Sequence, residues 1–411
     1  MLGAPRLPDI VGAMADGSSA ERNGATGSGS GPLAGVRVLD LTNNLSGPYG
    51  TLVLAQQGAD VVKVERPPRG DILRGVGSTR GGVAAYFVNT NWGKRSIALD
   101  LRDDADREVL SALVEWADVL VENFRPGVMP GLGFAPADLC AAHPRLIYAA
   151  IRGFPSTSSL ADAPAYDHVI QAMTGFASVQ ADLKEGTPTL VQQAIVDKAT
   201  GLVAAQAVTA ALFERERTGR GQFLEIPMLR VGLNFLWPDA ATNASFVGEV
   251  DKLPPQARTF RLTRTADGYV ALITVAQDQF DGLLRATGRE ELIGDPKLSS
   301  PQQRGRHGAQ VMREVAASLR ELTTAEVIEL LSANGVPCGA VNDLDDVPAA
   351  MDAVAPGVIV RESHPQLGEM VHPAPAVEFD EPVAVRPAPA FGEHTAEVLA
   401  ELGIVRAPAA E

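Results

Sequence analysis

An aspartate stands at the start of the longest apolar helical pattern in the chain. Asp197 opens a predicted helix at about 197–217, whose apolar residues cover most of the circumference, so we expect this helix to be buried. An aspartate at a helix start commonly accepts backbone N–H groups of the first turn. The same position favours the ionised carboxyl group. Asp197 is therefore predicted as a helix cap, as a carboxylate nucleophile, or as both.

Basic residues gather in the first 125 residues of an acidic chain. The chain has 35 Lys and Arg against 50 Asp and Glu, a net charge of −15, which gives no general attraction to nucleic acid or to an anionic membrane. Arginine suits bidentate phosphate contacts, and a doubly wound sheet binds phosphates near its strand ends. The alternative is a solvated charged face. The cluster consists of Arg66, Arg69, Arg74, Arg80, Lys94, Arg95, Arg102 and Arg125.

Other kinds of site find little support in the sequence. A dinucleotide fingerprint would need a glycine where Leu45 stands. The six histidines show no helix-face metal spacing, and no G-x-S-x-G segment occurs, so we expect neither a metal site nor a hydrolase triad. Cys140 and Cys338 lie far apart and are expected to be free, buried thiols of a reducing compartment.

Strands alternate with helices through the first half of the chain. This alternation predicts an α/β protein with a parallel sheet covered on both faces, which is a doubly wound, Rossmann-like nucleotide-binding domain. The predicted strands are 36–41, 60–65, 96–100, 118–121, 145–150 and 222–228, and the predicted helices between them include 49–57, 104–116 and 136–142.

The length of 411 residues suggests two or three domains. Residues 1–31 are Gly- and Ser-rich and are expected to form a flexible extension. Residues 232–335 are expected to form a smaller α+β domain, and 32–231 together with 336–411 the large domain. We find no run of 18 apolar residues and a poor secretory signal, so we expect no membrane-spanning helix and a cytoplasmic location.

Seven short stretches, in order, resemble those of the class III CoA-transferases, the CaiB/BaiF family. Each stretch alone is weak, but the ordered set spans about Pro32 to Gly403. The stretches are 33–40, 58–65, Gly93-Lys94-Arg95-Ser96-Ile97-Ala98-Leu99-Asp100, Asn123-Phe124-Arg125-Pro126-Gly127, 218–222, 335–339 and 392–395.

The resemblance implies an interlocked homodimer with the active site between a CoA-binding large domain and a small domain. Asp197 matches the family's nucleophile, which forms a mixed anhydride and then an aspartyl-CoA thioester while CoA moves between carboxylic acids. An acyl-CoA and a carboxylic acid are then the substrates, with no tightly bound cofactor. By position, Arg66 and Arg102 match CoA phosphate contacts, Arg125 is a further one, and Leu99, Asn123 and Phe124 match the adenine and pantetheine path.

The chain also departs from the family pattern. Leu45 stands where a glutamine near the thioester is common, and Gly131 where a basic residue is common. Segment 240–258 holds no counterpart of the glycine-rich loop of formyl-CoA transferases. These departures argue against an oxalate/formate enzyme and leave the donor and acceptor acids open.

Two alternatives remain on the same scaffold. CoA-ester racemases use a His–Asp pair, but here the pair reads Tyr166-Asp167, and a tyrosine with a pKa near 10 is a poor base at neutral pH. His168 would need a shift of register to serve. A catalytically idle CoA-binding subunit is the other alternative, against which Asp197 counts. Tyr166 and Asp167 are thus supporting candidates. Asp167 is expected to be a carboxylate that supports the site through another residue, a carboxylate that orients the substrate, or only a turn residue.

Overall fold

The computed structural model describes residues 30–181, 185–249 and 260–405. The predicted extension up to residue 29 and most of the second half of segment 240–258 lie outside the described residues.

The centre of the protein is a parallel sheet of six strands. Its order, β5-β2-β1-β6-β7-β8, is the doubly wound order in which the chain direction across the sheet reverses between β1 and β6. The strands are β1 (Arg37–Asp40), β2 (Asp60–Glu65), β5 (Lys94–Ala98), β6 (Val119–Glu122), β7 (Ile147–Arg152) and β8 (Phe223–Pro227). The predicted mixed α/β fold with a parallel sheet is confirmed.

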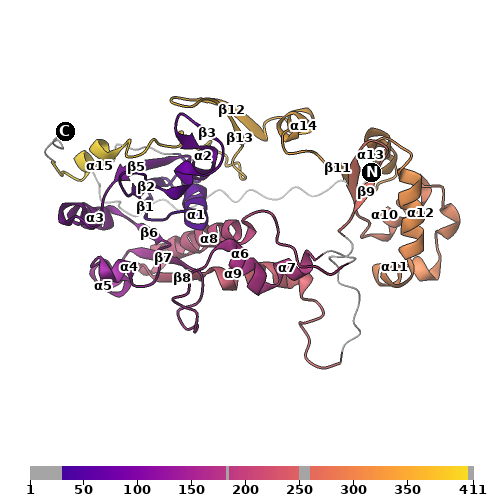
Figure 1. The fold of residues 1–411 in the computed structure, drawn as a ribbon, viewed down its shortest axis with the longest axis horizontal. Helices are drawn as coiled ribbons and strands as arrows, with labels where there is room; N and C mark the ends of the chain where they lie inside the picture. The colour runs from indigo at the N-terminus through magenta and orange to yellow at the C-terminus, as the bar shows by residue number, and fades with distance from the viewer. Residues whose placement is uncertain (1–29, 182–184, 250–259, 406–411) are drawn as a thin grey trace, which may run out of the picture.

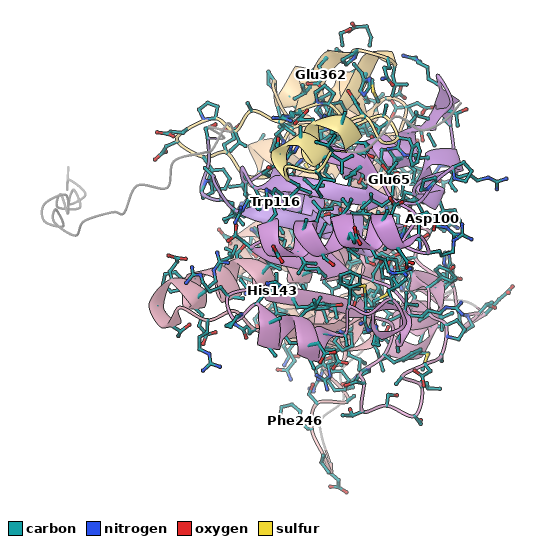
Figure 2. All side chains as sticks on the ribbon, turned by 90° about the vertical axis from the view of Figure 1, so that its left-hand side faces the viewer. Glu65, Asp100, Trp116, His143, Phe246 and Glu362 are labelled. Carbon is teal, nitrogen blue, oxygen red and sulfur yellow. The ribbon has the colours of Figure 1, made fainter. Side chains whose placement is uncertain are left out.

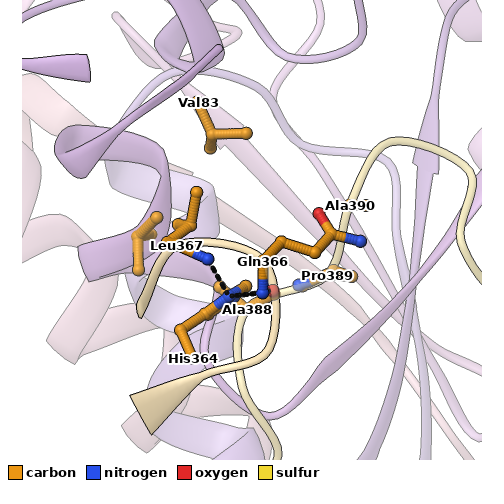
Figure 3. A pocket seen from close by; sticks show the side chains of 8 residues that line it. Val83, His364, Gln366, Leu367, Ala388, Pro389 and Ala390 are labelled. Atoms are coloured by element: carbon orange, nitrogen blue, oxygen red, sulfur yellow. Dashed lines mark hydrogen bonds between the residues drawn. The ribbon is translucent and has the colours of Figure 1, made fainter. Parts of the chain in front are cut away.

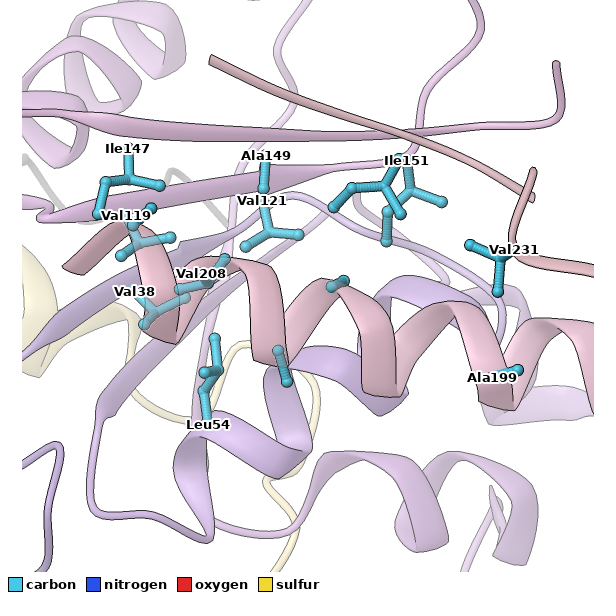
Figure 4. Packing of buried hydrophobic residues seen from close by; sticks show 14 of the residues in the cluster. Val38, Leu54, Val119, Val121, Ile147, Ala149, Ile151, Ala199, Val208 and Val231 are labelled. Atoms are coloured by element: carbon cyan, nitrogen blue, oxygen red, sulfur yellow. The ribbon is translucent and has the colours of Figure 1, made fainter. Parts of the chain in front are cut away.

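Helices cover both faces of this sheet (Figure 1). Successive strand residues point to opposite faces, so Val38 packs toward α1 (Ser46–Ala55) and α8 (Ile195–Thr218), whereas Leu39 packs toward α3 (Asp104–Trp116). Figure 4 shows the first of these cores, where Val38, Val119 and Ile147 lie near Val208 of α8. On the α3 face lie also α5 (Pro136–Ala142) and α15 (Thr395–Glu401).

Helix α8 is the long apolar helix that the sequence predicted. It ends at Gly219, a C-cap residue with a φ of 71°. By length and composition it could cross a membrane, but half of its most apolar window is buried against the sheet and its neighbouring helices. A buried core helix meets the same criteria, so the expectation of no membrane-spanning helix stays a prediction.

A smaller α+β unit follows in the chain. Its antiparallel sheet has the order β11-β10-β9, made of β9 (Leu262–Arg264), β10 (Tyr269–Leu272) and β11 (Cys338–Ala340). Leu283, Leu319 and Leu331 form its separate core. Strand β11 lies beyond the predicted boundary at residue 335, and the domain limits stay a prediction. The helices are α10 (Gln277–Ala286), α11 (Pro301–His307), α12 (Ala309–Leu319) and α13 (Thr324–Ala333), with 3-10 turns at Glu290–Leu292 and Pro296–Leu298.

The segment 354–391, which the sequence suggested to be a Pro-rich tail, contains a hairpin of β12 (Ile359–His364) and β13 (Gly368–Pro373). His364 closes it: its Nδ1 accepts the backbone N–H groups of Gln366 and Leu367, and its Nε2 lies 2.9 Å from the carbonyl oxygen of Ala388 (Figure 3). The hairpin packs on Trp92.

Several short elements were not predicted. They are α2 (Ala85–Asn91), α4 (Val128–Gly131), α6 (Asp167–Thr174), α7 (Phe176–Val179), α9 (Met228–Ala240), α14 (Val347–Val354), the strand pair β3 (Thr79–Arg80) and β4 (Val83–Ala84), and a 3-10 turn at Ile72–Gly75. Helices α2 and α6 both contribute to the site described next.

Candidate active site

Asp197 lies at the third position of α8, partly buried, and it does not cap the helix. The N-cap residue is Ala194, which has no side-chain acceptor. The acceptor comes instead from α6: Oδ1 of Asp167 accepts the backbone N–H of Val196 at 2.7 Å and that of Asp197 at 3.0 Å. The predicted cap role of Asp197 is therefore wrong, because Asp167 already holds the N–H groups that Asp197 would have capped.

Asp167 is itself fixed by Gln171, one turn later in α6. Both side chains are buried. Gln171 Nε2 donates to Asp167 Oδ2 at 2.5 Å and to the carbonyl oxygen of Gln193 at 2.9 Å, while its Oε1 accepts the N–H of Val191 at 2.9 Å. The pair thus ties the segment before α8, and the first turn of α8, to α6.

The electrostatics of Asp197 differ from the expectation for a helix start. Burial, and then the neighbouring Asp167 carboxylate, raise the pKa of Asp197 to about 7, against a smaller opposing effect of a hydrogen bond from Ser46. The helix start was expected to favour the ionised form. That expectation is wrong in direction, because burial, and then the charge of Asp167, disfavour the ionised carboxyl. Asp197 therefore exchanges its proton near neutral pH.

Two glycines bring the start of α1 against the first turns of α8. A Cβ on Gly201 would lie 2.8 Å from the carbonyl oxygen of Ser46 and 2.9 Å from the nitrogen of Gly50. Gly201 is one turn beyond Asp197, so this close approach brings the buried Ser46 within reach of the Asp197 carboxyl. Leu45 is buried in an apolar cluster with Leu73 and Phe87, against which Ala194 packs.

A buried ion cluster anchors the loop between β1 and α1. Asp40 Oδ2 accepts a hydrogen bond from Lys94 Nζ at 3.1 Å. Lys63 Nζ lies 3.0 Å from Asp71 Oδ2 and donates to the carbonyl oxygen of Thr42 at 2.6 Å. Buried charges of this kind are stable only when paired and hydrogen-bonded. The backbone N–H groups of this loop donate to side-chain oxygens that lie outside it. That of Thr42 donates to Asp40, that of Asn43 to Asn123, and that of Asn44 to Asp71.

The expected CoA contacts follow the carboxyl ends of the strands, where Glu65 and Asp100 lie in Figure 2. Arg66 and Arg102 are exposed and share one carboxylate: Arg66 Nε is 3.8 Å, and Arg102 Nε 2.9 Å, from Oδ1 of Asp100. Arg125 is exposed as well. The guanidinium groups of Arg66 and Arg102 are thus held side by side at the sheet edge.

The three remaining expected CoA residues have different surroundings. The side chain of Leu99 is fully buried in the core with Leu110, so it cannot contact a ligand in this structure. Asn123 donates from Nδ2 to the carbonyl oxygen of Asn43 at 2.7 Å and accepts the N–H of Asn43 at 2.9 Å. Asn123 therefore joins the loops after β1 and β6 rather than offering both amide groups to a ligand. Phe124 is half-buried beside the core of the α3 face.

Half of the predicted basic cluster is structural. Arg74 binds Glu65 in the interior, Lys94 belongs to the buried ion cluster, Arg95 binds Asp60, Glu397 and Glu401, and Arg80 donates to the carbonyl oxygens of Leu367 and Glu369. Arg74, Lys94 and Arg95 are buried, so they are poorly placed for phosphate binding. Arg80 is exposed, and its Nη1 is held by the two carbonyl oxygens. Arg66, Arg69, Arg102 and Arg125 remain exposed.

Tyr86 of α2 is a site residue that the sequence analysis missed. Burial, then the charges of Asp197 and Asp167, raise the pKa of Tyr86, so its phenol lies within electrostatic range of both carboxylates. No signal in the sequence marks this tyrosine, because α2 is too short to show a periodic pattern. Ser46 and Gln171 were also missed, because Ser46 meets Asp197, and Gln171 meets the segment before α8, only in the folded protein.

The residues of the racemase alternative are poorly placed as a base. Tyr166 is the N-cap residue of α6 and is 64% exposed. His168 is exposed on the same helix. Among the described residues no group of three His, Cys, Asp or Glu side chains could hold a metal ion. Cys140 and Cys338 are free thiols and are partly exposed, whereas the sequence suggested burial.

Comparison with known proteins identifies the family. Residues 33–395 match the sequence profile of CoA-transferase family III. The chain belongs to CoA-transferase family III. The family resemblance, and the assignment as a class III CoA-transferase, are confirmed by relatives that each match 90% of this chain. Succinyl-CoA:glutarate CoA-transferase of Mus musculus is 31% identical over 86% of its length, and formyl-CoA:oxalate CoA-transferase of Streptomyces avermitilis is 33% identical over 96%.

Solved structures agree with this assignment to CoA-transferase family III. A CAIB/BAIF family protein from Brucella suis has a TM-score of 0.75 at 30% identity, and the match covers 90% of this chain and 99% of that one. Protein Rv3272 of Mycobacterium tuberculosis has a TM-score of 0.77 at 30% identity, with the same coverage. The fold and the order of elements are therefore those of a known family.

Proposed function

We propose that this CoA-transferase moves CoA from an acyl-CoA donor to a carboxylic acid acceptor, with Asp197 as the covalent nucleophile. The observation that carries the proposal is the environment of Asp197. A partly buried carboxyl with a pKa of about 7 lies where α1, α6 and α8 converge, within electrostatic range of Tyr86 of α2. Perturbed carboxyl groups of this kind mark functional sites.

The first half of the reaction transfers CoA to the enzyme. A carboxylate oxygen of Asp197 attacks the thioester carbon, the C–S bond breaks, and CoA thiolate leaves an acyl-aspartyl anhydride. The thiolate then attacks the Asp197 carbonyl carbon and expels the donor acid as a carboxylate. The product is an aspartyl-CoA thioester.

The second half repeats these bond changes with the acceptor. The acceptor carboxylate attacks the aspartyl thioester and releases the thiolate, which then attacks the acceptor carbonyl and frees Asp197. No step needs an oxidant, a reductant or a net proton. Each enzyme-bound intermediate is an activated carboxyl derivative, an anhydride or a thioester, which keeps the transfer reversible.

The tetrahedral intermediates need N–H donors, and the start of α1 provides candidates. The N–H groups of Val196 and Asp197 are bound to Asp167. Among the described residues, the N–H groups of Ser46 and Gly47 have no acceptor, and Ser46 lies within hydrogen-bonding reach of Asp197. We assign the oxyanion contacts to these two amides, since preorganised donors beside the nucleophile stabilise the developing charge.

The phosphates of CoA are assigned to the exposed arginines at the sheet edge. Arg66 and Arg102 are held together by Asp100, and Arg125 follows β6. Guanidinium groups bind phosphate oxygens in a bidentate geometry. In a chain with a net charge of −15, this local group supplies the attraction that the whole protein lacks.

We also propose a homodimer and a cytoplasmic location. Exposed apolar side chains gather on three neighbouring helices and on the segment after α9, where Figure 2 shows Phe246 projecting away from the sheet. Exposed apolar surface of this kind marks an interface. The mass in solution, from light scattering after gel filtration, tests the dimer, and a monomer at micromolar concentration would contradict it. The residues are Val169 and Met173 of α6, Leu202 and Phe213 of α8, and Phe235 and Trp237 of α9.

The test of the function is a transfer assay with a panel of donors and acceptors. Succinyl-CoA with glutarate and formyl-CoA with oxalate come first, because relatives carry these names. We expect one pair to give a new CoA ester with the wild-type protein and none with Asp197→Ala. Deuterium uptake at the α-carbon of a CoA ester, without any transfer, would instead support racemisation.

A further inference from the structure

The first turn of α8 depends on a carboxylate from another helix. Asp167 Oδ1 accepts two consecutive N–H groups, those of Val196 and Asp197, and its exposed fraction is only 2%. Ala194, at the N-cap, supplies no acceptor. The flanking N–H groups have other acceptors: that of Ile195 donates to the carbonyl oxygen of Gln193, and that of Lys198 to the carbonyl oxygen of Ala194. Without Asp167, a buried donor and a partly buried donor at the nucleophile would lose their acceptor.

We propose that Asp167 is a positioning residue for Asp197: it fixes the direction of the nucleophilic carboxyl through the backbone and places a second carboxyl group beside it. This inference rests on the proposed role of Asp197. Asp167 touches the backbone of the nucleophile and not the reacting atoms, so it acts through Asp197.

The positioning part follows from the hydrogen bonds. An acceptor on the N–H of Asp197 holds the peptide plane from which the Asp197 side chain departs. Gln171 prevents Asp167 from turning away, because it binds the second carboxyl oxygen and is itself held by the backbone of residues 191 and 193. A displacement of about 1 Å at a reacting group is sufficient to lower a rate about 100-fold.

The electrostatic part follows from the proximity of two carboxyl groups. A carboxylate beside a second carboxyl opposes its ionisation. Asp167 is the charged group that raises the pKa of Asp197, second to burial. The raised pKa makes Asp197 a more basic nucleophile, at the cost of a smaller ionised fraction below neutral pH.

The other titratable groups near the first turns of α8 do not offset this effect. Lys198 Nζ donates to Gln193 Oε1 at 2.7 Å, and Tyr86 is uncharged in this pH range, since its pKa is raised. His168 of α6 is exposed. The remaining elements packed against α8 carry further titratable groups. On β7, Tyr148 and Arg152 both bind Glu122, and on β8 Glu225 binds the N–H of Ser156. The others are Tyr49 of α1 and the exposed Arg230 and Asp239 of α9.

Two substitutions separate position from charge. Asp167→Asn keeps an oxygen for the two N–H groups and removes the charge. Gln171 Nε2 then loses one acceptor and keeps the carbonyl oxygens of Val191 and Gln193. Asp167→Ala removes both acceptor and charge. Asp162→Asn is the matched control, because Asp162 is exposed in the segment before α6.

The measurement is the pH dependence of kcat/KM for transfer, together with kcat and KM at pH 8. We expect Asp167→Asn to keep kcat within about tenfold and to lower the pH midpoint by about one unit. We expect Asp167→Ala to lower kcat about 100-fold, with KM for the acyl-CoA changed less than about threefold. Asp162→Asn should match the wild type in all three quantities.

The inference is overturned if Asp167→Asn leaves the midpoint unchanged, and that variant decides the question even where Asp167→Ala does not fold. Asp197→Ala distinguishes a failure of the covalent mechanism from a failure of the positioning role. If it retains transfer, the proposed mechanism fails whatever Asp167 does. If it is inactive while both Asp167 variants behave like the wild type, only the positioning role fails.

Discussion

Gly50 of α1 and Gly201 of α8 face each other so closely that neither position has room for a side chain. A Cβ on Gly50 would lie 2.9 Å from the carbonyl oxygen of Gly201, and a Cβ on Gly201 would lie 2.9 Å from the nitrogen of Gly50. This contact brings together the two helix starts that carry Asp197 and the amides of Ser46 and Gly47. The geometry of the site thus depends on two residues that have no side chain.

Replacement of Gly201 should therefore damage the site. In Gly201→Ala the new methyl group meets Ser46 and Gly50, so α1 must move away. We expect a loss of about 1–3 kcal/mol in the free energy of unfolding, as for other overpacked sites. We also expect kcat to fall about 100-fold, because the amides leave the nucleophile. Denaturant unfolding and transfer kinetics measure both effects.

Gly305→Ala is the control for this substitution. Gly305 lies in α11, and a Cβ there meets no atom within 4 Å. We expect unchanged kinetics and equal or slightly higher stability, since alanine favours a helix over glycine. Wild-type kinetics in Gly201→Ala would show that the approach of α1 to α8 is unimportant for transfer.

The pH dependence of the wild-type enzyme follows from the state of Asp197. The nucleophile is active when ionised, and its pKa is about 7. The value of kcat/KM should rise with pH through about 7 and fall about tenfold for each unit below it. A profile that is flat from pH 5 to 8 would contradict the raised pKa.

The Asp197 carboxyl should lower the free energy of unfolding at pH values where it is ionised. Its pKa in the folded protein is raised from 3.8 to about 7, so the folded state holds the proton more tightly than the unfolded state. Stability from this group is present at about pH 4 and is lost as the pH rises through 7. Asp197→Asn should be inactive, yet at pH 8 more stable than the wild type by about 1–3 kcal/mol, which allows for partial exposure.

Denaturant unfolding at two pH values provides the test of this stability difference. At pH 4 the two proteins should differ little, because the wild-type carboxyl is then protonated when folded. A wild-type protein that is the more stable of the two at pH 8 would mean that Asp197 is stabilised as an anion.

The arginine pair should control the affinity for CoA. Arg66→Ala or Arg102→Ala should each raise KM for the acyl-CoA about tenfold, the equivalent of one charge-assisted hydrogen bond, and should change kcat less than about threefold. The effect should shrink at high salt, because the contacts are exposed. Arg220→Ala, an exposed arginine after α8, is the control. An unchanged KM in both variants would indicate that the CoA phosphates bind elsewhere.

The elements with strong local signals were predictable from the sequence. Helix 104–116 has a cap at Asp103 and a clear apolar face, and helix 136–142 starts with a proline, so both bounds agree with α3 and α5. The buried strand 60–65 was equally clear. Short helices such as α2 and α6, and the hairpin among the prolines of the last segment, have no such signals.

The site was predictable only in part, for a physical reason. Asp197 could be identified because it opens a long helix and matches a family position. The residue that caps α8 could not be identified from the sequence, because Asp167 is far away in the chain and reaches α8 only in the folded protein. Charge alone also misled: Lys94 and Arg74 were grouped with phosphate-binding residues, but both are buried with carboxylate partners.

The most direct test of the account is to trap the acyl or CoA group on the enzyme. The wild-type protein is incubated with a panel of acyl-CoAs, treated with hydroxylamine or borohydride, and analysed by intact and peptide mass spectrometry. The account predicts a modification on the peptide that contains Asp197, at that residue, and none in Asp197→Ala. A modification on another residue, or transfer activity without any adduct on Asp197, would contradict it.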